Sequence, residues 1–184
     1  MRRAICGLLA KELRFETGLS MKRVVLPLLL MACGASAPAK APPSSPSSLL
    51  GQPAPSFKRE AVNGSTVEVG TAGGKVTVVK FIATYCQPCM KTLPAIEKMH
   101  EEHPEIAIVG VSEDEHESEA KQLASSMHLT FPVVHDQQQV LAARYRVRDL
   151  PVTYVLDGKG NIAWVGGPEK SQDDLVAAAL ATKP

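Results

Sequence analysis

The stretch KVTVVKFIATYCQPCMKTLPAI, residues 75–96, decides the fold of this chain. Its first part, through Ile82, is rich in β-branched side chains, which is typical of a central, buried β-strand. Residues 88–102 follow, and apolar Leu93 and Ile96 recur there at the spacing of one helix face. The sequence therefore predicts a strand that leads directly into a helix, with two cysteines at the junction.

On the C-terminal side of this stretch, predicted strands and helices continue to alternate. Further strands are expected at residues 106–111, 131–134, 152–156 and 162–165. Helices are expected after Ser112, at residues 138–145 and at residues 171–180. Ser112 is predicted to cap its helix, and the acidic run at residues 113–119 is interpreted as a solvated helix face rather than a docking patch.

On the N-terminal side, Asn63-Gly64 predicts a β-hairpin between short extended pieces near residues 61–62 and 66–69. Together with the alternating strands and helices, this hairpin predicts an α/β domain with helices layered on a sheet.

Two of the four cysteines, Cys86 and Cys89, are spaced C-x-x-C at the strand–helix junction. In a chain with this alternation, that placement predicts a thioredoxin-like redox motif. The reactive form of cysteine is the thiolate, which the free N–H groups and the dipole of a helix start stabilise. We therefore expect Cys86 to be the nucleophile at an exposed cap and Cys89, one turn inside, to resolve the mixed disulfide. Pro88 supplies a helix-compatible φ in the first turn.

Three other interpretations of the dithiol are a structural disulfide, a zinc site and a copper carrier. A purely structural disulfide would close too short a loop to constrain the unfolded chain by much. A zinc site with His100 and His103 would need ligands roughly 16 Å away along the helix, too far for one ion. A copper carrier that uses Cys86 and Cys89 remains an alternative.

Composition excludes one broad class of function. The chain has 184 residues, with 20 basic and 19 acidic side chains, and aromatic residues make up only 4%. We therefore expect no nucleic-acid partner, because both a basic surface and stacking side chains are scarce.

The positive charge gathers at the N-terminus, where residues 1–32 carry six basic and two acidic side chains. Residues 24–32 form an apolar run that is too short to span a bilayer and suits a signal peptide. Met21 begins a more compact signal than Met1 and is an alternative start. The residues before Cys33 resemble a bacterial lipobox, which predicts lipidation of Cys33; ordinary signal cleavage nearby is the alternative.

Residues 33–50 are predicted to form a tether, because a Pro-, Ser- and Ala-rich segment buries too little apolar surface to order itself. The folded domain is expected over residues 51–184. This layout predicts an exported domain held by a lipid anchor on a membrane of the bacterial envelope, facing the periplasm.

The motifs of residues 51–182 resemble those of the TlpA/ResA-type membrane-tethered thioredoxins, within the AhpC/TSA-redoxin superfamily. The resemblance rests on GQPAPSF at residues 51–57, FIATYCQPC at residues 81–89, Pro94, and Leu150-Pro151 before a strand. It implies a thioredoxin fold, with a central mixed sheet, flanking helices and an N-terminal hairpin extension.

The resemblance also implies an activity and partners. Such proteins reduce disulfides of exported proteins, including apocytochrome c, and receive electrons from a membrane partner. The resemblance implies a cis Pro151 that faces the dithiol and shapes client binding, and Leu150, Tyr85 and Pro88 are expected to contribute to that surface. No cofactor and no metal is expected, and the protein is expected to be a monomer.

Two residues depart from the pattern of the resemblance. Tyr85 replaces the usual tryptophan, and Lys80 stands where thioredoxins bury an acid that relays the proton of the resolving cysteine. Lys80 is either desolvated and partly neutral, or has a buried stem and an ammonium in solvent; we favour the second. A cation near the sulfurs would favour the thiolate and make the dithiol more oxidising. Glu113 is an alternative acid near the cysteines, although a helix N-terminal charge is the favoured interpretation.

A thiol peroxidase of the same superfamily is the principal alternative function. Peroxiredoxins resemble this chain but carry Pro-x-x-x-Thr-x-x-Cys at the peroxide-reducing thiol. Here Ala83 and Val79 occupy the Thr and Pro positions before Cys86, so that signature is missing.

Overall fold

The computed structural model of the chain describes residues 47–184. The expected leader, Met21, Cys33 and most of the tether lie outside the described residues. Leu49, within the stretch predicted as tether, packs into the core, so ordered packing begins before the expected boundary at Gly51. In the described part of the chain, no helix is long and apolar enough to cross a membrane.

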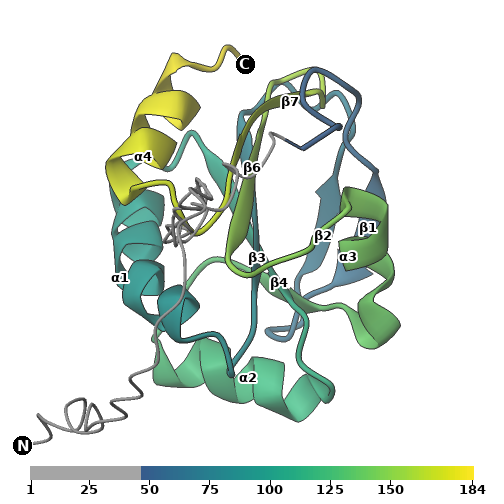
Figure 1. The fold of residues 1–184 in the computed structure, drawn as a ribbon, viewed down its shortest axis with the longest axis vertical. Coiled ribbons are helices and arrows are strands. Elements are labelled where there is room, and N and C mark those ends of the chain that lie inside the picture. The colour runs from purple at the N-terminus through teal and green to yellow at the C-terminus, as the bar shows by residue number, and fades with distance from the viewer. Residues whose placement is uncertain (1–46) are drawn as a thin grey trace, which may run out of the picture. The chain divides into compact units, whose positions relative to one another are not determined.

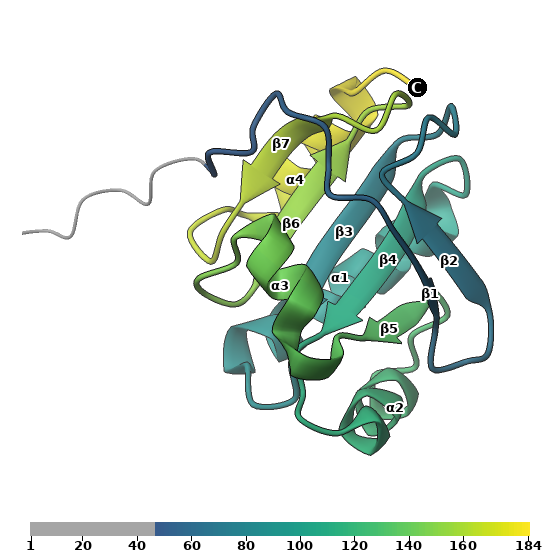
Figure 2. The same cartoon turned by 90° about the vertical axis from the view of Figure 1, so that its right-hand side faces the viewer.

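A five-stranded mixed sheet forms the centre of the domain, in the order β5-β4-β3-β6-β7 (Figure 1 and Figure 2). Its strands are β3 (Thr77–Ile82), β4 (Ala107–Ser112), β5 (Val133–His135), β6 (Val152–Leu156) and β7 (Ile162–Gly166). β3 runs parallel to β4 and antiparallel to β6, so the strand that precedes the cysteines is the middle one. The predicted mixed sheet of a thioredoxin fold is confirmed.

Helices α1 (Gln87–Glu102) and α4 (Gln172–Ala181) cover one face of the sheet (Figure 1). Helix α2 (Glu117–Ser126) packs beside β5 (Figure 2). The opposite face carries α3 (Val140–Tyr145), which follows the 3-10 turn η1 (Gln137–Gln139), and the hairpin (Figure 2). The hairpin pairs β1 (Phe57–Glu60) with β2 (Thr66–Val69). Its first strand thus lies earlier than expected, and residues 61–62 lead into the turn.

The side chains of β3 alternate between two buried clusters. Val79 and Phe81 pack with the hairpin and α3, whereas Val78 and Ile82 pack with α1 and α4. Because both faces of β3 are covered, its apolar run is continuous rather than alternating with polar residues. Lys80 is the exception within that run.

The structure corrects the interpretation of the acidic run. Ser112 does not cap a helix; it is the last residue of β4, and its carbonyl accepts a hydrogen bond from Asp136 N–H. Helix α2 starts later, at Glu117, where the Glu119 carboxylate accepts a hydrogen bond from His116 N–H at 2.9 Å. Residues 113–116 therefore connect β4 to α2. They follow the C-terminal end of β4, which lies beside the C-terminal end of β3, and so they are at the same end of the sheet as the cysteines.

Candidate active site

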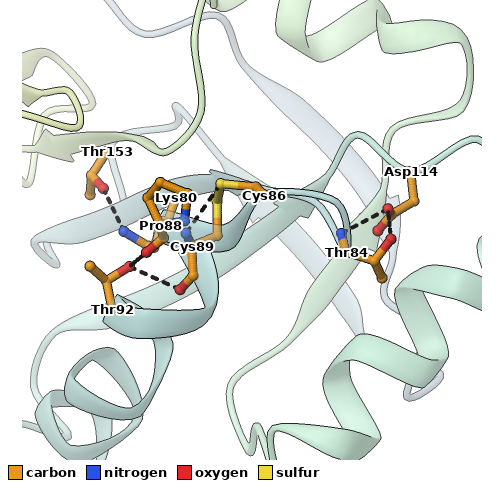
Figure 3. The surroundings of a disulfide bond; sticks show 8 residues. All are labelled: Lys80, Thr84, Cys86, Pro88, Cys89, Thr92, Asp114 and Thr153. Carbon is orange, nitrogen blue, oxygen red and sulfur yellow. Dashed lines mark hydrogen bonds between the residues drawn. A yellow bond between two sulfur atoms is a disulfide. The ribbon is translucent and has the colours of Figure 1, made fainter. Parts of the chain in front are cut away.

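The dithiol sits at the start of α1, as the spacing predicted. Cys86 is the N-cap residue, with extended φ and ψ of −86° and 93°, and its Sγ accepts a hydrogen bond from Cys89 N–H at 3.1 Å. A disulfide joins Cys86 to Cys89, whose Cα atoms lie 5.2 Å apart (Figure 3). Pro88 occupies the first turn of the helix. The helix start can therefore stabilise a negative charge on the Cys86 sulfur.

The nucleophile is less exposed than we predicted. Cys86 is 6% exposed and Cys89 is fully buried, and both belong to the buried cluster under α1. Cys86 nevertheless borders a cleft of about 750 Å³. Its wall includes Tyr85, Pro88 and Leu150, together with residues of α3 and the loop that follows it. Tyr85 is 65% exposed at the rim, so its ring offers apolar surface to a molecule that enters the cleft.

The bond between Leu150 and Pro151 is cis, as the resemblance implied. Leu150 lines the cleft beside Cys86, whereas Pro151 is buried and lines a smaller crevice behind Pro88. Three of the four residues expected to bind clients thus converge on the cleft, and Pro151 lies next to it in the chain.

Lys80 is buried, which corrects the favoured interpretation of an ammonium in solvent. Lys80 is 3% exposed, and its Nζ donates a hydrogen bond to Thr153 Oγ1 at 3.3 Å. Burial lowers the pKa of Lys80 to about 8. The amine is enclosed because β3 is the middle strand, and β6 holds Thr153 directly opposite Lys80.

Glu113 follows β4 and lines the cleft with Cys86, as the adjacency of the two strand ends predicted. The favoured interpretation of Glu113 as a helix N-terminal charge is wrong, since α2 begins four residues later. Burial raises the pKa of Glu113 to about 7, with a further contribution from the nearby Asp136 carboxylate. Glu113 Oε1 is buried and has no hydrogen-bond partner among the described residues. A half-buried acid that titrates near neutrality thus faces the cleft.

The comparisons with known proteins agree with this geometry. Residues 50–165 match the AhpC/TSA family. This chain belongs to the AhpC/TSA family. Within it, the chain is 36% identical over 116 residues to the thioredoxin-like protein YneN of Bacillus subtilis, covering 61% of this chain and 68% of that protein. It is 26% identical over 168 residues to the thiol-disulfide oxidoreductase ResA of Geobacillus thermodenitrificans, covering 90% and 97%.

Solved structures place this AhpC/TSA chain among the thioredoxin folds. MTB dsbF superposes with a TM-score of 0.62 and 25% identity, over 68% of this chain and 93% of that one. The exposed lipoprotein thioredoxin Etrx1 of Streptococcus pneumoniae superposes with a TM-score of 0.62 and 22% identity, over 68% and 98%. The solved structures show the thioredoxin fold, and the relatives named ResA and YneN identify a thiol-disulfide oxidoreductase of the ResA kind, as the motifs indicated.

Sequence reasoning missed Asp114, which it counted among solvated acids. Asp114 is 3% exposed, and its carboxylate accepts hydrogen bonds from Thr84 N–H (2.8 Å), Thr84 Oγ1 (2.6 Å) and Ser112 Oγ (2.8 Å). Its carbonyl also contacts His135 Nε2 at 2.9 Å. Figure 3 shows the disulfide between two polar pairs, Thr84 with Asp114 on one side and Lys80 with Thr153 on the other. Asp114 thus fixes the loop that ends at Cys86.

Asp136 has a similar role on the far wall of the cleft. Its carboxylate accepts hydrogen bonds from the N–H groups of Leu141 and Ala142, both at 2.8 Å, and so fixes the start of α3. Gln138 and Gln139 before it have positive φ values of 61° and 54°, which cost energy in non-glycine residues. Buried carboxylates therefore hold both walls of the cleft. The sequence could have suggested only the contacts of Asp136, because they join it to residues five and six positions later in the chain.

Proposed function

We propose that this AhpC/TSA protein reduces disulfides of exported proteins in the bacterial envelope. Cys86 acts as nucleophile and Cys89 as resolving thiol. The observation that carries the proposal is the position of Cys86, at the N-cap of α1, bonded to Cys89 and bordering the cleft. A structural disulfide would need no such cleft, and the peroxidase signature before Cys86 is missing from the sequence.

The reaction consists of two thiol–disulfide exchanges. The Cys86 thiolate attacks one sulfur of the client disulfide, and the other client sulfur leaves as a thiolate that takes a proton from solvent. Cys89 then loses its proton and attacks Cys86 Sγ, which releases the second client sulfur. Two electrons pass from the dithiol to the client, and the Cys86–Cys89 disulfide of this structure is the product. A membrane electron donor must then return the dithiol to its reduced form.

The cleft suits an extended client segment that carries the disulfide. Tyr85, Pro88 and Leu150 offer apolar surface beside Cys86. An open cleft with apolar walls can bind an extended segment through its apolar side chains, without a deep pocket that selects one side chain. Unfolded exported proteins, apocytochrome c among them, present segments of this kind.

Lys80 and Glu113 are expected to tune the two cysteines in opposite directions. A charged Lys80 favours a thiolate on the sulfur that it faces, which makes the dithiol more oxidising. An ionised Glu113 beside the cleft disfavours the Cys86 thiolate. If Lys80→Asn leaves the reduction potential unchanged, the role of Lys80 in tuning is refuted.

An envelope location is supported by the leader-like residues 1–32 and by Cys33 after an apolar run. A structural neighbour is itself an exposed lipoprotein. We propose that Cys33 is lipidated and that the tether after it holds the domain at a membrane. Mass spectrometry of the mature protein tests this, since an unmodified peptide that spans Cys33 would exclude lipidation.

Insulin reduction in the presence of a thiol reductant tests the activity. We expect the purified protein to accelerate it, the Cys86→Ser variant to be inactive, and Cys89→Ser to accumulate a mixed disulfide with the client. Turnover equal to that of Cys86→Ser would refute the proposal. Peroxide-dependent oxidation of the dithiol would instead favour the peroxidase alternative, and stoichiometric copper binding the carrier alternative.

A further inference from the structure

The face of β3 on which Lys80 lies is the face that carries the dithiol. Side chains of alternate strand residues share a face, so Lys80 points to the same side as Val78 and Ile82. Val78 and Ile82 belong to the buried cluster that includes Cys86 and Cys89. Lys80 is therefore a cation-forming group placed under the first turn of α1, on the buried side of the disulfide (Figure 3).

A narrow crevice connects the surroundings of Lys80 with the surface. Its volume is about 50 Å³, enough for one or two water molecules. Pro88 and Thr92 of α1 form one wall, and Thr153 and Trp164 form the other. Pro88 also borders the cleft beside Cys86, so the crevice and the cleft open on two sides of the same helical turn.

The groups around Lys80 leave its charge without a counter-ion in the oxidised protein. Thr153 Oγ1 on β6 is neutral, Gly110 opposite Lys80 on β4 has no side chain, and α1 contributes the disulfide of Cys89. The other charged residue that lines the crevice is Lys170, which is exposed. Within residues 47–184, no carboxylate forms an ion pair with Lys80. The group able to become an anion beside Lys80 is therefore reduced Cys89.

We propose that Lys80 takes up the proton of Cys89 in the resolving step and exchanges it with solvent through the crevice. This inference rests on the proposed function, because it concerns the second exchange of that reaction. Lys80 thus stands where thioredoxins have a buried acid. Unlike a carboxylate, which accepts a proton in its charged form, a lysine accepts a proton as the neutral amine.

The step balances as follows. In the mixed disulfide, the proton of the Cys89 thiol moves to the neutral amine of Lys80, giving a thiolate and an ammonium. The thiolate forms the bond to Cys86 Sγ, the bond between Cys86 and the client breaks, and the client sulfur leaves with the electron pair. Once Cys89 is in the disulfide, the ammonium has no counter-ion. Burial holds the pKa of Lys80 to about 8, so its proton exchanges with water in the crevice, and the fraction of Lys80 that is neutral near this pH serves the next turnover.

The first experiment uses the wild-type protein and needs no catalysis. Trp164 is the single tryptophan of the chain and lines the crevice with Lys80, so its fluorescence can report the ionisation of Lys80. We expect a transition near pH 8 in the oxidised protein and a transition at higher pH after reduction, when the Cys89 thiolate stabilises the ammonium. Equal midpoints in the two redox states would refute the coupling between Lys80 and Cys89.

The second experiment measures the resolving step by stopped flow, starting from a mixed disulfide at Cys86. We expect Lys80→Met to slow this step on the order of 100-fold at neutral pH and to abolish the fluorescence transition. Lys80→Arg keeps the cation but cannot accept a proton, so Cys89 must lose its proton to solvent and the resolving step should remain slower than in the wild type at neutral pH. Lys91→Met, at an exposed position of α1, is the matched control and should behave as wild type.

The outcomes separate this inference from the function on which it rests. An unchanged resolving rate in a folded Lys80→Met variant refutes proton transfer to Lys80, while insulin reduction that depends on Cys86 still supports the reductase. A fast Lys80→Arg variant would also refute it, since charge alone would then suffice. If Lys80→Met does not fold, the wild-type fluorescence comparison still decides the matter.

Discussion

Removal of the Asp114 carboxylate should release the loop that carries Cys86. In Asp114→Ala, three hydrogen bonds are lost, and the N–H and hydroxyl of Thr84 lose their shared acceptor. Hydrogen bonds to a charged acceptor contribute about 1.5–3 kcal/mol each, but the three share one buried carboxylate whose own desolvation offsets part of the sum. We therefore expect the free energy of unfolding to fall by about 3 kcal/mol. Asp114→Asn, which keeps one oxygen acceptor, should lose about half as much.

Urea unfolding of the oxidised protein measures this loss directly. With a slope of about 2 kcal/mol/M, the midpoint for Asp114→Ala should fall by roughly 1.5 M. The exposed neighbour Glu115 supplies the control, and Glu115→Ala should leave the midpoint unchanged. We also expect slower alkylation of reduced Cys86 in Asp114→Ala, because the helix N-cap geometry depends on the loop at Thr84. A loss below about 1 kcal/mol, with normal alkylation, would show that Asp114 does not hold this loop.

Three further predictions follow from Lys80, Glu113 and Tyr85. The folded-state pKa of Lys80, about 8, lies below its ordinary value of 10.5, so burial of the charge destabilises the oxidised protein below pH 8. Stability should therefore rise by about 2 kcal/mol from pH 8 to pH 10, and urea titrations of Lys80→Met should lack this rise. The raised pKa of Glu113, about 7, predicts that its ionisation above pH 7 opposes the Cys86 thiolate. The alkylation rate of Cys86 should then show an inflection near pH 7 that Glu113→Gln removes; a persistent inflection would assign it elsewhere. Tyr85→Ala should raise KM for a peptide disulfide several-fold, about 1 kcal/mol of lost apolar contact, without changing Cys86 alkylation; an unchanged KM would exclude Tyr85 from the client surface.

Much of the fold and the core of the site could be predicted from local sequence. The apolar run of β3 and the helical spacing in α1 are short-range patterns, so the position of Cys86 at the helix start follows from them. The predicted ends of strands and helices were less accurate where local and long-range contacts favour different structures. Serine is a residue type that often caps helices, but the pairing of Ser112 with His135 of β5 continues the strand through this position.

The buried polar groups show where sequence reasoning ends. Lys80 lies in an apolar run whose pattern does not reveal how deeply the strand is covered, and only α1, β6 and the crevice determine that its amine is desolvated. Asp114 stands among four exposed or half-exposed acids of the same run, and its contact with Thr84 joins residues thirty positions apart.

The sequence by itself determined the order of strands and helices, the C-x-x-C pair at a helix start and the positions that depart from the thioredoxin pattern. The tertiary structure alone decided which acid is buried, which acid faces the cleft and whether the lysine reaches water. The physical reason is that secondary structure depends on side chains a few residues apart. Desolvation and hydrogen bonding of a charged group depend instead on every element that packs around it.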